Sequence, residues 1–168
     1  MFKKLEVTAN ISLIAISVLF GFVLLKNQVF SDRSRQPPEL SPGTRITLSG
    51  VDWKSRHWTL LLALSNQCRF CSESASFYKR LTAGVATDSV RVIAVLPQSI
   101  DIGREYLKSL DLSIEEIRQT PMEALKVSGT PTLILVNEEG IVGKVWRGKL
   151  SAEKEAEVMA LLQSCRDC

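Results

Sequence analysis

Residues 59–71 read TLLLALSNQCRFC and hold the pattern that decides the fold. Residues 59–64 form a nearly continuous apolar run, which is typical of a strand buried on both faces of a sheet. Residues 70–81 then place Phe77 and Leu81 four positions apart, as on one side of a helix. Cys68 and Cys71 therefore lie where a buried strand gives way to a helix.

The sequence on either side of this stretch alternates between strand and helix patterns. Predicted strands cover 45–48, 59–64, 89–96, 132–136 and 141–147, and predicted helices cover 70–81, 100–110, 121–126 and a segment that starts after Ser151. Residues 112–120 stay ambiguous. A helix joins the strands near 60 and 90, so these should be parallel, whereas the turn at 137–140 makes the last two antiparallel. We therefore predict an α/β fold with a mixed central sheet and helices on both faces.

The N-terminal segment has a different character. Residues 7–25 read VTANISLIAISVLFGFVLL and carry no charge. A helix of this length rises about 28 Å, close to the ~30 Å hydrocarbon core of a bilayer. A cleaved signal peptide is the alternative, but its apolar region would be shorter and followed by a small-residue cleavage pattern. We predict a cytoplasmic stub and transmembrane anchor at 1–26, a proline-containing linker at 27–43 and a folded domain at 44–168.

Charge alone does not orient this anchor. Lys3 and Lys4 precede the apolar run, and Lys26, Arg33 and Arg35 follow it. Paired cysteines such as Cys68 and Cys71 form disulfides mostly in oxidising compartments, so we expect a single-pass protein with its domain on the extracytoplasmic, periplasm-like side of the membrane. The net charge is only +3, and basic residues are scattered among acidic ones, which argues against a nucleic-acid partner.

The two cysteines of the C-x-x-C motif have different predicted tasks. A sulfur at a helix start faces unpaired N–H groups and the positive end of the helix dipole, which lower the thiol pKa below its usual value of about 8.5. We expect Cys68 to be the attacking thiolate and the more buried Cys71 to resolve the mixed disulfide. Arg69 and Phe70 lie between them and are predicted to help stabilise the Cys68 thiolate. We expect no cofactor and no bound metal.

With these residues in view, residues 42–163 resemble the thioredoxin superfamily, and especially its membrane-anchored TlpA-like branch. Besides C-x-x-C, the resemblance rests on VSGTPTL at 127–133 and on a hairpin through 139–140 with Gly148 after it. It implies a thioredoxin-like fold, a cis peptide bond before Pro131, and a client-binding role for Thr130 and Pro131. It also implies a thiol–disulfide oxidoreductase of extracytoplasmic proteins that acts in maturation of cytochrome c or another redox protein. A membrane thiol protein would be its electron donor or acceptor.

The chain departs from the usual family pattern at three positions. Gln67 stands where Trp often precedes the first cysteine, and Phe70 stands where Pro is frequent. Some members carry a buried acid under the pair, at the position of Leu62 here. An apolar residue at this position would leave proton transfer to water or to another group.

Other uses of the cysteines stay open. Cys165 and Cys168 form a second C-x-x-C, which is either an exchange relay or an accessory disulfide at the terminus, and both pairs together could make a zinc site. An alternative function is a non-catalytic copper carrier or assembly factor, because soft thiolates suit copper(I). A thiol peroxidase is a third possibility, although Ser65 replaces the threonine of the usual T-x-x-C.

Overall fold

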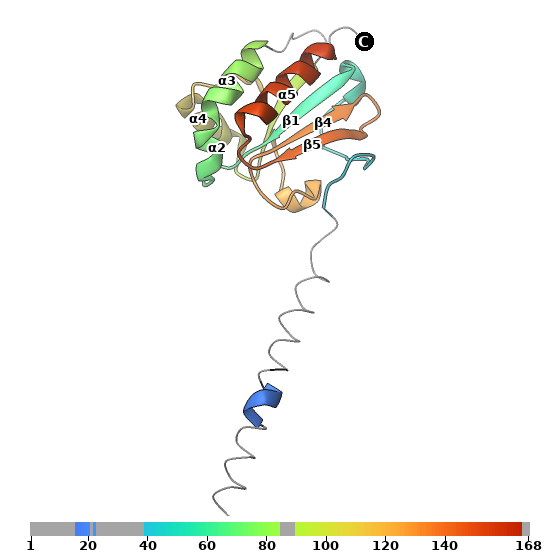
Figure 1. The fold of residues 1–168 in the computed structure, drawn as a ribbon. Helices are drawn as coiled ribbons and strands as arrows, with labels where there is room; N and C mark the ends of the chain where they lie inside the picture. The colour runs from blue at the N-terminus through green and yellow to red at the C-terminus, as the bar shows by residue number, and fades with distance from the viewer. Residues whose placement is uncertain (1–15, 21, 23–38, 85–89, 166–168) are drawn as a thin grey trace, which may run out of the picture. The chain divides into compact units, whose positions relative to one another are not determined.

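The computed structural model describes residues 16–20, 22, 39–84 and 90–165, and the chain divides into two units, Met1–Pro38 and Glu39–Cys168 (Figure 1). In the first unit, residues 16–20 are helical and their large apolar side chains are exposed. Most of the predicted membrane anchor lies outside the described residues. Within the part of the chain that is described, no helix has the length and apolar character needed to cross a bilayer.

The second unit is built on a mixed sheet. Its described strands are β1 (Trp58–Ala63), β2 (Val90–Leu96), β3 (Glu116–Gln119), β4 (Thr132–Asn137) and β5 (Val142–Arg147), in the order β3-β2-β1-β4-β5. The first three strands run parallel, and β4 is antiparallel to both β1 and β5. The predicted parallel pair and the predicted hairpin are therefore confirmed.

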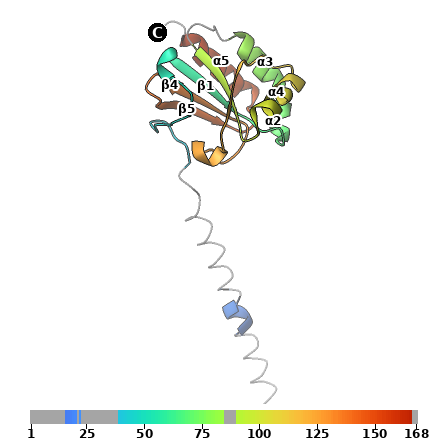
Figure 2. The same cartoon turned by 180° about the vertical axis from the view of Figure 1, so that it is seen from behind.

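One face of this sheet is covered by α-helices. They are α2 (Arg69–Glu73), α3 (Ala75–Gly84), α4 (Ile100–Ser109) and α5 (Ala152–Ser164). Figures 1 and 2 show α3 and α5 on the same side of the strands. Side chains of these helices, such as Phe77, Leu107 and Val158, form one core with Leu60 and Leu62 of β1.

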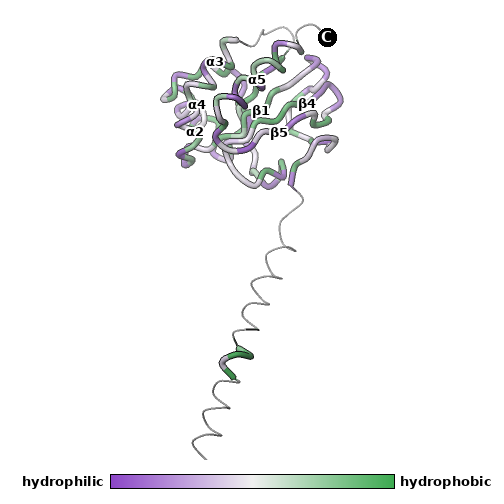
Figure 3. Tube along the Cα trace, viewed as in Figure 1, coloured by the Kyte–Doolittle hydropathy of each residue, from purple (hydrophilic) through white to green (hydrophobic). Residues whose placement is uncertain are grey.

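The opposite face is covered by a different kind of structure. Leu40, Ile46 and Leu48 of the segment before β1 pack there with Leu125 of the 3-10 helix η2 (Met122–Leu125), against Leu61 of β1. Successive side chains of a strand point to opposite faces, so two covered faces require an apolar residue at nearly every position. Figure 3 shows this hydrophobic character along the central strands.

The structure corrects two predicted elements and assigns the ambiguous stretch. The strand expected at 45–48 is reduced to an isolated bridge between Arg45 and Ile141. The helix expected at 70–81 is two helices, broken at Ser74, whose hydroxyl donates to the Phe70 carbonyl at 2.9 Å. The ambiguous stretch 112–120 contains β3 at the sheet edge. In the described residues the face opposite the α-helices carries 3-10 helix and extended chain, so the expectation of helices on both faces holds only in this limited form.

Candidate active site

Strand pairing brings the predicted site residues to one edge of the sheet. Ala63 at the end of β1 pairs with Thr132 at the start of the antiparallel β4. The loop that leads to Cys68 and the loop that carries Thr130 therefore emerge together. The loop after β2 lies beside the loop that leads to Cys68, because the Gln98 amide donates a hydrogen bond to the Ser65 hydroxyl at 3.2 Å. Open α/β folds place their sites at this carboxyl edge.

Cys68 is the residue that caps the start of α2. Its sulfur accepts a hydrogen bond from the Cys71 N–H at 3.3 Å, and its thiol donates to the Thr130 carbonyl at 3.0 Å. Cys68 is half-buried, whereas Cys71 is fully buried. The pair thus offers one accessible sulfur and one protected sulfur, joined through backbone at a helix start.

The surroundings separate the two thiols in acidity. Burial acts to raise the pKa of Cys68, but hydrogen bonds from the Cys71 and Thr130 side chains and from the N–H groups of Cys71 and Phe70 outweigh it, so the pKa is lowered. Burial, together with the hydrogen bond to the Cys68 side chain, raises the pKa of Cys71 to about 12. When the pair carries one negative charge, that charge therefore belongs on Cys68 rather than on Cys71.

Thr130 and Pro131 lie beside this sulfur. Their peptide bond is cis, as the resemblance implied, and Pro131 is buried. The Pro131 carbonyl accepts from the Gly148 N–H at 2.7 Å, which holds the loop after β5 against the loop before β4. Thr130 is half-buried, and its carbonyl contacts the Cys68 thiol directly.

The two residues between the cysteines point outward. The Arg69 side chain is 86% exposed and pairs with Glu73 at 2.6 Å. Glu73 also binds Lys149 at 2.9 Å, and hydrogen bonds from Lys149 and Arg69 lower the pKa of its carboxyl. Phe70 is 54% exposed and influences Cys68 through its backbone N–H. Tuning of the thiolate by the charge of Arg69 stays a prediction.

The second C-x-x-C lies on another helix. Cys165 caps the C-terminal end of α5 and is buried in the core on the helical face. Cys168 lies outside the described residues, so the relay remains an untested possibility. Within the residues that are described, no group of three or more His, Cys, Asp or Glu side chains is arranged to hold a metal ion.

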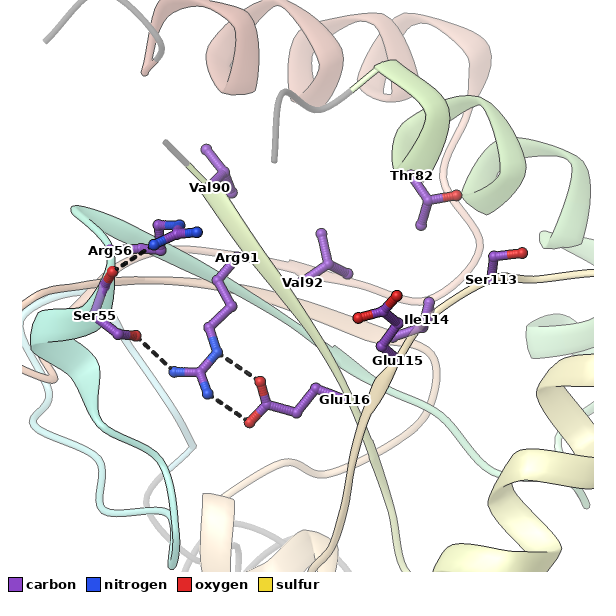
Figure 4. A pocket seen from close by; sticks show the side chains of 10 residues that line it. All are labelled: Ser55, Arg56, Thr82, Val90, Arg91, Val92, Ser113, Ile114, Glu115 and Glu116. Atoms are coloured by element: carbon purple, nitrogen blue, oxygen red, sulfur yellow. Dashed lines mark hydrogen bonds and ion pairs between the residues drawn. The ribbon is translucent and has the colours of Figure 1, made fainter. Parts of the chain in front are cut away.

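A cavity of about 520 Å³ lies at the other edge of the sheet, near the start of β2 (Figure 4). Its main polar feature is Arg91, whose guanidinium binds both oxygens of Glu116 at 2.6 and 2.7 Å. The same guanidinium donates to the Asp52 carbonyl and the Ser55 hydroxyl. These bonds hold η1 (Trp53–Ser55) and β3 to β2, so they stabilise the fold. No cysteine is among the described residues that line the cavity.

Sequence reasoning missed one polar group near the pair. Tyr78 of α3 is 1% exposed and belongs to the same core as Cys71. Its position in the apolar stripe of the helix is typical of an ordinary packing residue. The signal that could have found it is the seven-residue spacing from Cys71, which returns to the same helix face after two turns.

Comparison with solved structures identifies this architecture. No family model and no curated protein sequence matches the chain. A structure assigned as the thiol:disulfide interchange protein DsbE from Chlorobium tepidum aligns with a TM-score of 0.59 at 19% identity, covering 76% of this chain and 99% of that one. The thioredoxin domain of a thiol-disulfide oxidoreductase from Bacteroides vulgatus aligns with a TM-score of 0.55 at 14% identity, covering 73% and 98%. A thiol:disulfide interchange protein from a Bacteroides species aligns with a TM-score of 0.54 at 14% identity, covering 74% and 91%.

The chain has the thioredoxin-like fold. The expectation drawn from the sequence is therefore confirmed at the level of architecture. In this thioredoxin-like domain the cysteine pair, the cis peptide bond and the loop after β5 all lie at the carboxyl edge of the sheet.

Proposed function

We propose that the chain is a thiol–disulfide oxidoreductase that exchanges disulfides with client proteins through Cys68 and Cys71. The observation that carries this proposal is the Cys68 sulfur. It is partly accessible, it accepts the Cys71 N–H at the start of α2, and the buried thiol that it needs lies three residues along the chain. Reactive thiols occupy this kind of environment in proteins, whereas structural cysteines are buried and inert.

The proposed cycle needs no group beyond the two thiols and the client. In the reducing direction the Cys68 thiolate attacks one sulfur of a client disulfide, and the client S–S bond breaks as a mixed disulfide forms. Cys71 loses its proton and attacks the Cys68 sulfur. The client sulfur held in the mixed disulfide then leaves with its electron pair and takes up a proton, as the other client sulfur did when the client S–S bond broke. The client has gained two electrons, and the chain holds a Cys68–Cys71 disulfide; oxidation of a client is the reverse.

Thr130 and Pro131 are proposed to hold the client chain beside the reacting sulfur. The support is positional, because the Thr130 carbonyl lies 3.0 Å from the Cys68 sulfur on a loop fixed through Gly148. A client sulfur that reaches Cys68 must approach next to this loop. Phe70, between the two cysteines, adds exposed apolar surface next to the pair.

We also propose a cellular setting for this activity. The uncharged run at 7–25 would anchor the chain in a bacterial inner membrane, with the domain in the periplasm. The domain predicted from residue 44 begins earlier, because Leu40 is buried in its core and the folded unit spans Glu39–Cys168. Clients would then be extracytoplasmic proteins such as apocytochrome c, and a membrane thiol protein would exchange electrons with the pair. Carbonate extraction of membranes and protease protection of spheroplasts test this setting, and a soluble or cytoplasmic domain would contradict it.

The experiment that tests the activity is a redox titration of the full-length chain in detergent. Acid-trapped thiols are counted across a glutathione series for the unmodified chain, Cys68→Ser and Cys71→Ser. We expect one reversible two-electron transition that either substitution abolishes, with a mixed disulfide trapped in Cys71→Ser. Thiols that are blocked by stoichiometric copper(I) and show no such transition would favour a metal carrier, and peroxide-dependent turnover would favour a peroxidase.

A further inference from the structure

The hydroxyl of Tyr78 is a buried polar group without a hydrogen-bond partner in the described residues. The side chain is 1% exposed, so bulk water does not reach it. A buried donor that stays unpaired destabilises the folded state, and phenylalanine would fill the same space without that cost. We therefore expect the Tyr78 hydroxyl to find a hydrogen-bond acceptor in another state of the molecule.

The helix geometry directs this hydroxyl toward the cysteine pair. Cys71, Ser74 and Tyr78 follow one another at intervals of three and four residues, which keeps them on one face across the break between α2 and α3. The Tyr78 N–H donates to the Ser74 carbonyl at 3.1 Å, so helical geometry continues through the break. Helical side chains lean toward the N-terminus of the helix, which brings the Tyr78 ring over the turn next to Cys71.

The electrostatics of the site agree with this placement. Burial is the main cause that raises the pKa of Tyr78. An interaction with the Ser74 hydroxyl opposes it, and charges on Cys71, Tyr106 and Cys68 add to it. The interaction with Ser74 falls short of a hydrogen bond by its geometry, and the Ser74 hydroxyl already donates to the Phe70 carbonyl. Tyr78 is therefore a neutral phenol, able to donate, at neutral pH. The described titratable groups that act on Cys71 or are influenced by its charge are Cys68 from the start of α2, Tyr78 from α3 and Tyr106 from α4.

We propose that the Tyr78 hydroxyl donates a hydrogen bond to the Cys71 sulfur when that sulfur carries negative charge during resolution of the mixed disulfide. This inference rests on the proposed exchange function. In the step, the Cys71 sulfur forms a bond with Cys68, the bond between Cys68 and the client breaks, and the client sulfur leaves with the electron pair. The proton that Cys71 has lost ends on the departing client thiolate, and Tyr78 keeps its own proton throughout.

Tyr106 supplies a matched control. Its hydroxyl also lies within the electrostatic influence of Cys68 and Cys71, but it already pairs with the Ser72 hydroxyl at 3.3 Å on the exposed side of α2. Tyr106→Phe therefore removes a phenol from the neighbourhood of the pair without removing an unpaired buried donor. Tyr78→Phe removes the unpaired donor and keeps the ring.

The test separates the two chemical steps. The full-length chain in detergent, carrying Cys165→Ser and Cys168→Ser, is reduced and mixed with 5,5′-dithiobis(2-nitrobenzoate) in a stopped-flow instrument. The first aryl thiolate released reports attack by Cys68, and the second reports resolution by Cys71. We expect Tyr78→Phe to slow the second release about 10- to 100-fold, because one hydrogen bond to a charged group is lost. The rate of the first release should stay within about twofold of that of the unmodified side chain. Tyr106→Phe should leave both steps within about twofold.

The pH profile of the second step gives a readout that a packing defect would not produce. Its midpoint should move upward in Tyr78→Phe and downward with 3-fluorotyrosine at position 78, which keeps the shape and donates more strongly. An unchanged second step in Tyr78→Phe, an equal slowing of both steps, or an equal effect of Tyr106→Phe would overturn the proposal. If the first release is no faster than that of a simple thiol in the unmodified chain, the exchange function itself fails.

Discussion

The chain carries the C-x-x-C spacing twice, at opposite ends of helices. Cys68 caps the start of α2, where N–H groups are unpaired, whereas Cys165 caps the end of α5, where carbonyls are unpaired. The first environment favours a negative sulfur and the second opposes it. We therefore expect the helix end, and not the C-x-x-C spacing alone, to decide the reactivity of Cys68 and Cys165.

Access to a client differs as well. Cys68 is half-buried beside Thr130 at an edge where three loops meet. Cys165 is 6% exposed within the core that α3 and α5 form with the sheet. We therefore expect a client disulfide to reach the Cys68 sulfur more readily than the Cys165 sulfur.

The largest expected difference between the pairs is in turnover. Cys68→Ser should reduce disulfide exchange with a model client such as insulin more than about 1,000-fold, because the nucleophile is lost. Cys165→Ser should retain activity within about twofold. Turnover assays of both variants at equal concentration check this, and a comparable loss in Cys165→Ser would establish the relay.

A second prediction concerns the buried partner of Cys68. Because burial raises the pKa of Cys71 from its ordinary value to about 12, folded Cys71 keeps its proton in a range where unfolded Cys71 loses it. The resulting stability is complete below about pH 9 and is lost as the pH rises toward 12. Its slope should reach about 1.4 kcal/mol per pH unit. Burial also raises the pKa of Tyr78 and of Tyr106, so both the reduced chain and Cys71→Ala should lose stability as the pH rises. Denaturant unfolding of the reduced chain should show a slope that is steeper by this amount than that of Cys71→Ala; parallel curves would contradict the assignment.

A smaller effect is expected from the loop opposite Cys68. The Thr130 side chain lowers the pKa of both thiols, so Thr130→Val should raise the Cys68 pKa and slow its alkylation at pH 7 by about two- to fivefold. Thr82→Val at the distant end of α3 is the control and should have no effect. Alkylation kinetics measure both, and faster reaction in Thr130→Val would show that the side chain favours the thiol form.

The smallest effect should come from Arg69. Its guanidinium is exposed and already paired with Glu73, so solvent screens its influence on Cys68. Arg69→Ala should change the alkylation rate of Cys68 by less than about twofold, as should Arg104→Ala, which breaks a comparable exposed pair with Asp101. If Arg69→Ala alone slowed the alkylation of Cys68 fivefold, the charge of Arg69, rather than the start of α2, would be the main cause of the lowered Cys68 pKa.

The central part of the fold could be predicted because its signals are local and strong. A strand covered on both faces must be apolar throughout, which is why β1 and β4 are evident in the sequence. The edge strand β3 gave no such signal. Its side chains at Glu116, Arg118 and Gln119 are polar, and only Ile117 is buried. Its place in the sheet depends on the parallel pairing with β2 and on the ion pair from Arg91, neither of which is a local property.

The strand predicted at 45–48 was wrong for a related reason. Ile46 and Leu48 are buried, so their alternation was real. Their backbone, however, forms only a bridge to the hairpin, through bonds such as Ile46 N–H to the Gly140 carbonyl. Side-chain alternation reports burial of a face and does not report a continuous hydrogen-bonded ladder.

At the candidate site, motif spacing and resemblance located Cys68, Cys71, Thr130 and Pro131, and the structure brings them together. Tyr78 escaped notice because a phenol in an apolar helical stripe has the pattern of a packing residue. Its orphaned hydroxyl becomes visible only when hydrogen-bond partners are counted in three dimensions.

The most direct test of the account compares Cys68 and Cys165 within one reduced chain. Iodoacetamide modification is followed by peptide mass spectrometry from pH 5 to pH 10. We predict that Cys68 titrates below the usual thiol value of about 8.5 and reacts at least about tenfold faster than Cys165 at pH 7. A Cys68 that titrates at or above that value, or that reacts no faster than Cys165, would contradict the claim that the helix start makes this sulfur the nucleophile.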